Sequence, residues 1–118
     1  MKNIFIEYPK CSTCKKAKDH LDSCNIDYQE RDIKENNPTY EELKSWYEIS
    51  NLPLKKFFNT SGLIYKDLNL KEKLPTMSVE EQLKLLSTDG MLVKRPLLIT
   101  NNKIITGFKE KEYENIKD

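Results

Sequence analysis

Two cysteines separated by two residues are the side chains of this sequence best suited to chemistry. Cys11 and Cys14 lie in the segment Tyr-Pro-Lys-Cys-Ser-Thr-Cys-Lys-Lys, residues 8–16. The thiolate is the reactive form of cysteine, and only ~3% of an ordinary thiol, with a pKa of about 8.5, is ionised at pH 7. Reactivity at this pair therefore depends on surroundings that lower the pKa of one of the two thiols.

The elements around the pair predict such surroundings. Residues 3–8 alternate as a strand does, and residues 12–25 have the apolar spacing of a helix, so Cys11 falls at the helix N-terminus. Unpaired backbone N–H groups and the helix dipole stabilise a negative charge there. Lys10 and Lys15 add positive charge. Cys-x-x-Cys sites at helix N-termini have thiol pKa values of roughly 3.5–7.5, so we expect Cys11 to be the nucleophile.

Cys14 lies one helical turn after Cys11. Residues i and i+3 share a helix face, so Cys14 can close a disulfide with Cys11, and we expect it to be less accessible to solvent. This asymmetry predicts an attacking thiol and a resolving thiol. Half of a zinc knuckle and a chance pair are the alternatives, and the strand–turn–helix context favours the redox pair.

The third cysteine and the single histidine lie further along the same predicted helix. The apolar stripe contains Cys14, Ala17, Leu21 and Cys24, so we expect Cys24 to be buried. Ten residues of helix separate Cys24 from Cys14 by about 15 Å, whereas a disulfide needs Cα atoms within ~7 Å. We therefore expect Cys24 to form neither a disulfide nor a zinc site with Cys14. His20 falls off the stripe, and we expect it to be solvated.

Composition and charge exclude several classes of protein. The 118 residues suit one domain, 1–118, and the formal net charge of +1 gives no reason to expect direct nucleic-acid binding. No apolar run reaches the ~18–20 residues of a membrane span, and no signal peptide is recognisable. Three cysteines do not suit a secreted disulfide scaffold, so we expect a cytoplasmic protein without metal or cofactor.

The rest of the chain predicts two strand-bearing ends around a helical insertion at about 38–90. A second strand at 27–33 completes a βαβ unit with parallel strands, and Arg31 within it is expected to be an exposed or interface residue. Capping boxes at Thr39–Glu42 and Ser78–Glu81 begin two helices, the first at about 40–50. Shorter helical segments are expected at 54–58 and 63–70, a hairpin at 97–100 and 103–106, and a last helix at 110–117.

This order of elements resembles the thioredoxin fold, an α/β fold with a mixed sheet arranged as β-α-β, a helical insertion and β-β-α. Several motifs further resemble the arsenate-reductase-like family, which includes the Spx and MgsR-type regulators. They are the cysteine segment, Glu-Arg-Asp-Ile at 30–33, Phe-Phe-Asn-Thr-Ser-Gly at 57–62, Asp-Gly-Met-Leu-Val-Lys-Arg-Pro-Leu at 89–97 and Gly-Phe-Lys-Glu at 107–110. The resemblance implies that Cys11 is the reactive cysteine, that Arg95 lies beside its sulfur, and that Pro96 is a cis-proline facing it.

The sequence also departs from part of that family. Glutaredoxin-coupled arsenate reductases of the family carry one nucleophilic cysteine and three arginines around the oxyanion. Here Arg95 matches one of these arginines, Asn59 occupies the position of another, and residues 106–108 contain none. An arsenate anion needs several charge-assisted contacts to leave water, and the Cys-x-x-Cys pair itself resembles the regulators more than the reductases.

Three functions are consistent with these residues. We expect a thiol–disulfide oxidoreductase with Cys11, Cys14 and Arg95 at its site, reset by thioredoxin, glutaredoxin or a low-molecular-weight thiol. The second hypothesis is an Spx-type redox-sensing regulator that binds RNA polymerase. The third is a glutaredoxin- or thioredoxin-coupled arsenate reductase in which Cys11 attacks arsenic.

Overall fold

A four-stranded sheet forms the centre of the molecule. The computed structural model describes residues 3–101, 103–114 and 116. The strands are β1 (Asn3–Glu7), β2 (Tyr28–Asp32), β3 (Leu97–Ile99) and β4 (Ile104–Thr106), in the order β2-β1-β3-β4. β1 pairs with β2 in parallel and with β3 in antiparallel fashion, and β3 and β4 form an antiparallel hairpin. The sheet is therefore mixed, as predicted.

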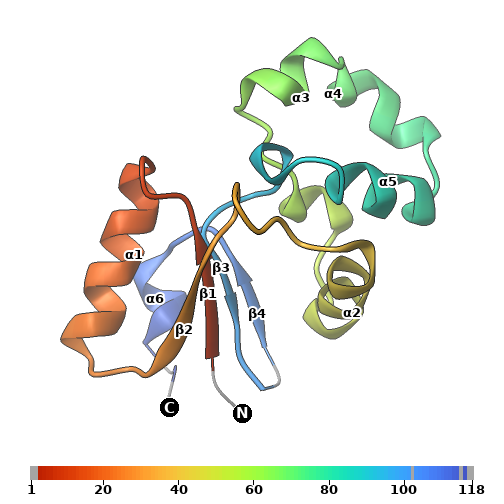
Figure 1. Ribbon diagram of the computed structural model, residues 1–118. Coiled ribbons are helices and arrows are strands. Elements are labelled where there is room, and N and C mark those ends of the chain that lie inside the picture. Colours follow the sequence, from red (N-terminus) through yellow and green to blue (C-terminus); the bar gives the residue numbers. More distant parts are fainter. Residues whose placement is uncertain (1–2, 102, 115, 117–118) are drawn as a thin grey trace.

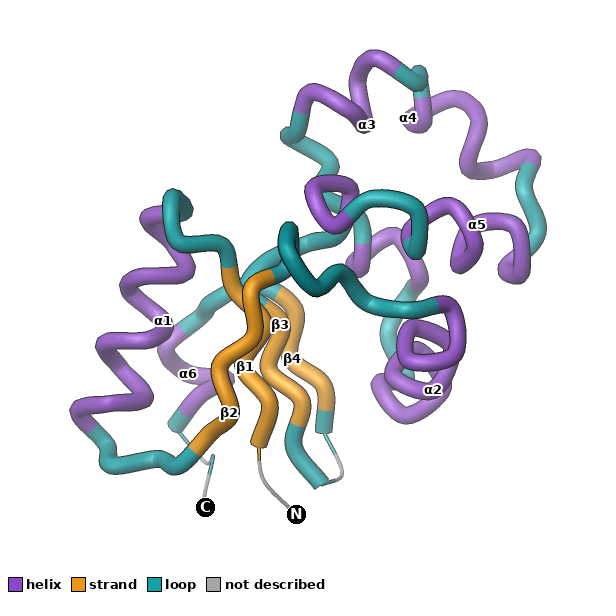
Figure 2. Tube along the Cα trace, viewed as in Figure 1, coloured by secondary structure: helices purple, strands orange, loops and turns teal. Residues whose placement is uncertain are grey.

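Helices flank the sheet on two sides (Figure 1). α1 (Ser12–Ser23) and α6 (Glu110–Tyr113) lie together on one side, and the helices between β2 and β3 gather beyond the other. Figure 2 shows these as a run of helices linked by short loops. They are α2 (Tyr40–Ser50), α3 (Leu63–Asp67), α4 (Leu70–Lys73) and α5 (Val79–Leu86), with 3₁₀ turns at Leu54–Phe57, Leu74–Thr76 and Gly90–Leu92.

Two apolar clusters hold these layers together. Successive side chains of a strand point to opposite faces of the sheet. Phe5, Leu98 and Ile105 therefore pack against Ala17 and Leu21 of α1. The opposite face of the sheet contributes to a larger cluster with the insertion, made of Ile6, Leu97, Ile99 and Ile104 with Leu43, Trp46, Phe57, Phe58, Leu83 and Leu86 among others. The insertion thus shares its core with the sheet.

Both predicted capping boxes are present. The Thr39 hydroxyl accepts the Glu42 N–H at 3.1 Å, and the Glu42 carboxylate accepts the Thr39 N–H at 3.0 Å. Ser78 and Glu81 repeat the arrangement at the start of α5. The predicted helix at 63–70, in contrast, is divided into α3 and α4, because Asn69 adopts the left-handed conformation (φ +54°) that asparagine tolerates. α6 ends at Tyr113, and residues 115 and 117 of the predicted last helix, 110–117, lie outside the described residues.

Arg31 is not exposed, which was one of the two expectations for it, but lies at the contact between β2 and α2. Its side chain is only 11% exposed and forms a two-pronged ion pair with Glu42, with N–O distances of 2.7 and 2.8 Å. It also donates to the backbone carbonyls of Asn36 and Asn37. Arg31 is therefore a structural residue that joins β2 to α2.

The end of α1 corrects a second expectation. Cys14, Ala17 and Leu21 are buried as predicted, but Cys24 is exposed. The helix ends at Ser23, so Cys24 is its C-cap and no longer follows the inward stripe. His20 is half-buried rather than solvated, with its ring 5.9 Å from the rings of Phe108 and Tyr113.

This arrangement is the thioredoxin-like fold that the resemblance implied. No helix in the described part of the chain has the length and apolar content required to cross a membrane. Because β1 and β3 are antiparallel, the end of β1 and the start of β3 meet at one edge of the sheet, with Ile6 opposite Leu97. The segment after β1 carries Cys11, and the segment before β3 carries Arg95 and Pro96.

Candidate functional site

Cys11 is the N-cap of α1. Its backbone is extended (φ −96°, ψ 119°), and its Sγ accepts the backbone N–H of Cys14 at 3.4 Å. A sulfur therefore occupies the position where a Ser, Thr, Asp or Asn oxygen usually caps a helix. The Cys11 N–H donates to the Tyr8 carbonyl at 2.9 Å, which closes the turn between β1 and α1. The sulfur consequently lies at the positive end of a twelve-residue helix.

The surroundings of Cys11 lower its thiol pKa. Partial burial opposes ionisation, but several interactions outweigh it: hydrogen bonds from the Cys14 side chain and from the backbone N–H groups of Cys14 and Thr13, and the positive charge of Arg95. The pKa of Cys11 therefore lies below its ordinary value, as the sequence predicted. Lys10 and Lys15, which the sequence also suggested as a source of positive charge, are both exposed.

Cys14 has the opposite character. It is fully buried, and this burial raises the pKa of its thiol to about 12, with further contributions from its hydrogen bond to Cys11, from the Cys11 charge and from Glu7. The backbone N–H of Tyr8 donates to the Cys14 sulfur and opposes this rise. The two thiols thus differ in both accessibility and acidity, with the Cys14 thiol donating its hydrogen to Cys11.

Arg95 lies at the same edge of the sheet. Its charge acts on Cys11, and its guanidinium carbon is 5.2 Å from the centre of the Tyr8 ring. One terminal nitrogen, Nη1, donates to the Met91 carbonyl at 3.4 Å, while Nε is buried without a partner among the described residues. The Arg95–Pro96 peptide bond is cis, as the resemblance implied. The arginine is therefore held in place with donor capacity left beside Cys11.

Asn59 lies next to Arg95. Its side-chain amide donates to the Met91 carbonyl at 3.3 Å, the same oxygen that Arg95 contacts. Its backbone N–H donates to Leu92, and its side-chain oxygen accepts from Ser61. Asn59 stands where the arsenate reductases described above carry an arginine. This position is thus adjacent to Arg95 and holds a neutral amide.

Glu7 is a site residue to which the sequence reasoning gave no role. Its side chain is only 8% exposed, and burial, together with Glu30, raises its pKa to about 7. Glu30 in turn is held by Lys18 of α1, with both N–O distances 3.0 Å. The sequence did indicate that Glu7 is buried. Glu7 lies two residues after the apolar Phe5 in a strand, so the two side chains point to the same face of the sheet.

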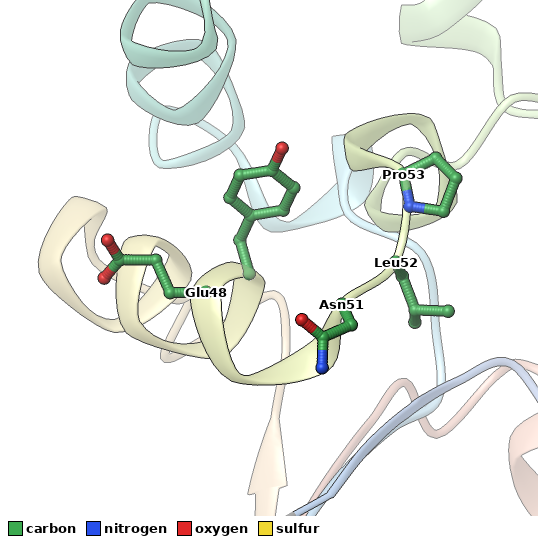
Figure 3. Close-up of a pocket in the computed structure, with 5 residues that line it drawn as sticks. Glu48, Asn51, Leu52 and Pro53 are labelled. Atoms are coloured by element: carbon green, nitrogen blue, oxygen red, sulfur yellow. The ribbon is translucent and has the colours of Figure 1, made fainter.

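Two other features of the described residues bear on where the site lies. No group of three or more His, Cys, Asp or Glu side chains there could hold a metal ion. A shallow depression of about 420 Å³ lies at the end of α2, lined by Tyr47, Glu48, Asn51, Leu52 and Pro53 (Figure 3). It contains neither cysteine of the pair, so the candidate site remains Cys11, Cys14 and Arg95 with Glu7 beneath them.

Comparison with known proteins gives the relatives of this chain. It is 54% identical to the uncharacterized protein YusI of Bacillus subtilis over 114 residues, which cover 97% of each chain. It is 33% identical to the regulatory protein MgsR of the same organism over 108 residues, covering 92% of this chain and 84% of MgsR.

Solved structures of similar proteins point to the same family. An ArsC family related protein from Bacteroides fragilis is 56% identical and superimposes with a TM-score of 0.96, covering 99% of this chain and 98% of that one. A structure described as a possible arsenate reductase, from Streptococcus mutans UA159, is 48% identical with a TM-score of 0.87, covering 95% of this chain and 97% of that one. The model of the ArsC family matches residues 6–116. The chain therefore belongs to the ArsC family.

Proposed function

We propose that this protein is a thiol–disulfide oxidoreductase whose redox pair is Cys11 and Cys14. The Cys11 thiolate attacks a substrate disulfide, forms a mixed disulfide and releases one substrate thiol. Cys14 then attacks Cys11 and releases the second substrate thiol, which leaves a Cys11–Cys14 disulfide. A thiol reductant such as thioredoxin, glutaredoxin or a low-molecular-weight thiol returns the pair to the reduced state, as expected in a reducing cytoplasm.

The difference between the two thiols is the observation that carries this proposal. Cys11 is partly accessible with a lowered pKa, and Cys14 is buried with a raised pKa and donates to Cys11. An attacking thiol has to be ionised and reachable, whereas a resolving thiol has only to reach its neighbour. Arg95 supports the proposal as well, because its positive charge stabilises the thiolate before attack and again when Cys11 leaves as a thiolate.

Turnover of a small disulfide with a thiol reductant tests the proposal. The wild-type protein, Cys11→Ser, Cys14→Ser and Cys24→Ser should be compared. We expect Cys11→Ser to abolish turnover, Cys14→Ser to accumulate a mixed disulfide on Cys11, and Cys24→Ser to behave as wild type. Full turnover by the Cys11→Ser protein would contradict the proposal.

A redox-sensing transcriptional regulator is the second candidate. The 33% identity to the regulatory protein MgsR over 108 residues favours it. The same Cys11–Cys14 pair would then act as the sensor, and its oxidation would control binding to RNA polymerase. A pull-down with purified polymerase under oxidising and reducing conditions separates the two candidates, because only the regulator should bind in a redox-dependent manner that Cys14→Ser abolishes.

A further inference from the structure

A second cation, Lys94, lies at the same edge of the sheet as Cys11. Its side chain passes over Gly107, the residue that follows β4: a Cβ added at Gly107 would lie 3.2 Å from Cε and 3.9 Å from Nζ of Lys94. The Gly107 N–H donates to the Pro96 carbonyl at 2.8 Å, so this glycine is bonded to the cis-proline that precedes β3. The Lys94 ammonium group is therefore placed near Pro96, over a residue without a side chain.

Lys94 and Arg95 extend to opposite sides of Pro96. The Arg95 guanidinium lies against the ring of Tyr8, which follows β1, whereas Lys94 lies against Gly107, which follows β4. In the sheet, β3 lies between β1 and β4. Neighbouring strands are about 4.8 Å apart, so the two contacts are separated by about 10 Å. The edge of the sheet thus presents one cation at the cysteine and a second cation about two strands away.

No carboxylate of the described residues neutralises either cation. The Lys94 side chain is half-buried and forms no ion pair or hydrogen bond with them, although three other lysines of the chain each bind a carboxylate. In Arg95, Nε is buried without a partner among the same residues, and Nη1 contacts only a carbonyl. Partly buried cations are stabilised by groups of opposite charge. This edge is therefore suited to a ligand that carries a negative charge.

The separation of the two cations indicates the size of this ligand. An ion pair joins N and O atoms within about 4 Å, so a tetrahedral oxyanion held at Cys11 by Arg95 cannot also reach a cation two strands away. A longer ligand can place its reacting sulfur at Cys11 and a negative group at Lys94. The geometry therefore favours an extended anionic substrate.

We propose that Lys94 binds a carboxylate of the substrate, and that the substrate is a low-molecular-weight disulfide that carries carboxylates. This inference rests on the proposed function, because it assigns the class of disulfide that Cys11 attacks. In a peptide disulfide each extended residue spans about 3.5 Å, so a carboxylate one or two residues from the sulfur can extend across the separation of two strands. The Cys11 thiolate forms a bond to one substrate sulfur, the substrate S–S bond breaks, and the other half leaves as a thiolate. The carboxylate held by Lys94 orients the disulfide and is itself unchanged.

Formation of the mixed disulfide on Cys11, followed by mass spectrometry, measures this binding. All proteins carry Cys14→Ser and Cys24→Ser, so that Cys11 is the one remaining thiol and the reaction stops at the mixed disulfide. Glutathione disulfide is compared with the same disulfide in which every carboxylate is an ethyl ester, because the two differ in charge but little in shape. Lys94→Gln and Lys94→Arg are compared with Lys103→Gln, which changes an exposed lysine just before β4, at the opposite end of that strand from Gly107.

We expect Lys94→Gln to lower the second-order rate constant for glutathione disulfide by about five-fold at low ionic strength, because one ion pair is lost. The rate constant for the ester should not fall, and Lys94→Arg should keep most of the preference for glutathione disulfide. Lys103→Gln should change neither rate constant. Equal effects of Lys94→Gln on the two disulfides, or equal effects of Lys94→Gln and Lys103→Gln on glutathione disulfide, would overturn this inference alone. Absence of a mixed disulfide on Cys11 with both reagents would overturn the proposed function as well.

Discussion

At the scale of single residues, the site depends on one sulfur taking the place of a helix cap. Cys11 accepts the N–H of Cys14, and Arg95 adds a positive charge. The Nε atom of Arg95 has no hydrogen-bond partner among the described residues. Cys14, three residues later, is fully buried. The same chemical group therefore has opposite acidity at the two positions, and the environment alone determines which thiol attacks.

Alkylation as a function of pH tests this assignment. In a Cys24→Ser background, Cys11 in Cys14→Ser should react with a midpoint below that of an ordinary thiol, and Cys14 in Cys11→Ser should hardly react below pH 10. Arg95→Met should raise the Cys11 midpoint because it removes a stabilising positive charge, whereas Arg95→Lys should restore part of the effect. Equal midpoints for the two cysteines would contradict the assignment.

At the scale of elements, the ion pair between β2 and α2 is expected to contribute to stability. Arg31 is 11% exposed and makes two bonds to Glu42, so Arg31→Met would leave a carboxylate with only its cap bonds. We expect the free energy of unfolding to fall by about 2–3 kcal/mol. Lys15→Met, which removes the exposed pair with Asp19, should change it by less than about 0.5 kcal/mol. Urea unfolding of both variants measures the difference, and equal effects would contradict it.

The buried carboxylate of β1 gives a pH dependence with a defined sign. Native Glu7 keeps its proton up to pH about 7, whereas the unfolded chain loses it near 4.5. Between these values the native state binds more protons, so this group makes the free energy of unfolding fall as pH rises. This carboxyl should lower the free energy of unfolding by on the order of 3 kcal/mol between pH 5 and pH 8, and Glu7→Gln should abolish that decrease. Urea unfolding at the two pH values checks this, and a parallel pH dependence in wild type and variant would contradict it.

Much of the element order could be predicted from the sequence, because its signals are local. The capping boxes, the strand–turn–helix at Cys11 and the hairpin at 97–106 depend on residues a few positions apart. Burial of Cys24 was predicted wrongly, because the residue at which α1 ends is not set by apolar spacing. The structural role of Arg31 could not be predicted, because its partner Glu42 comes from another element. The same holds for Glu7, whose neighbours Glu30 and Lys18 come from β2 and α1.

At the scale of the whole molecule, the sheet brings together residues more than eighty positions apart. Cys11 follows β1 and Arg95 precedes β3, and antiparallel pairing of these strands places both at one edge. The 3₁₀ turn Gly90–Leu92, which follows the insertion, supplies the Met91 carbonyl, and this oxygen accepts hydrogen bonds from both Arg95 and Asn59. Because the insertion and the sheet share one apolar cluster, we keep the prediction that residues 1–118 form one domain.

Arsenate reduction is expected to be weak or absent. Only Arg95 is free to contact an oxyanion at Cys11, since the second arginine of the sequence, Arg31, is bound to Glu42. Two missing arginine contacts would cost about 3–6 kcal/mol, or roughly 10²–10⁴ in rate. Asn59→Arg should raise arsenate turnover, because Asn59 lies beside Arg95, whereas Thr60→Arg, on an exposed neighbour, should raise it less. Assays with glutaredoxin or thioredoxin as donor would contradict this if the wild type turned over arsenate efficiently.

Mapping the disulfide that forms on mild oxidation tests the central claim most directly. The reduced protein is treated with diamide, free thiols are alkylated, and the peptides are identified by mass spectrometry. We predict a Cys11–Cys14 disulfide with Cys24 alkylated, and in Cys14→Ser treated with glutathione disulfide, a glutathione adduct on Cys11. A disulfide that includes Cys24, or an adduct that avoids Cys11, would contradict the assignment of Cys11 and Cys14 as the redox pair.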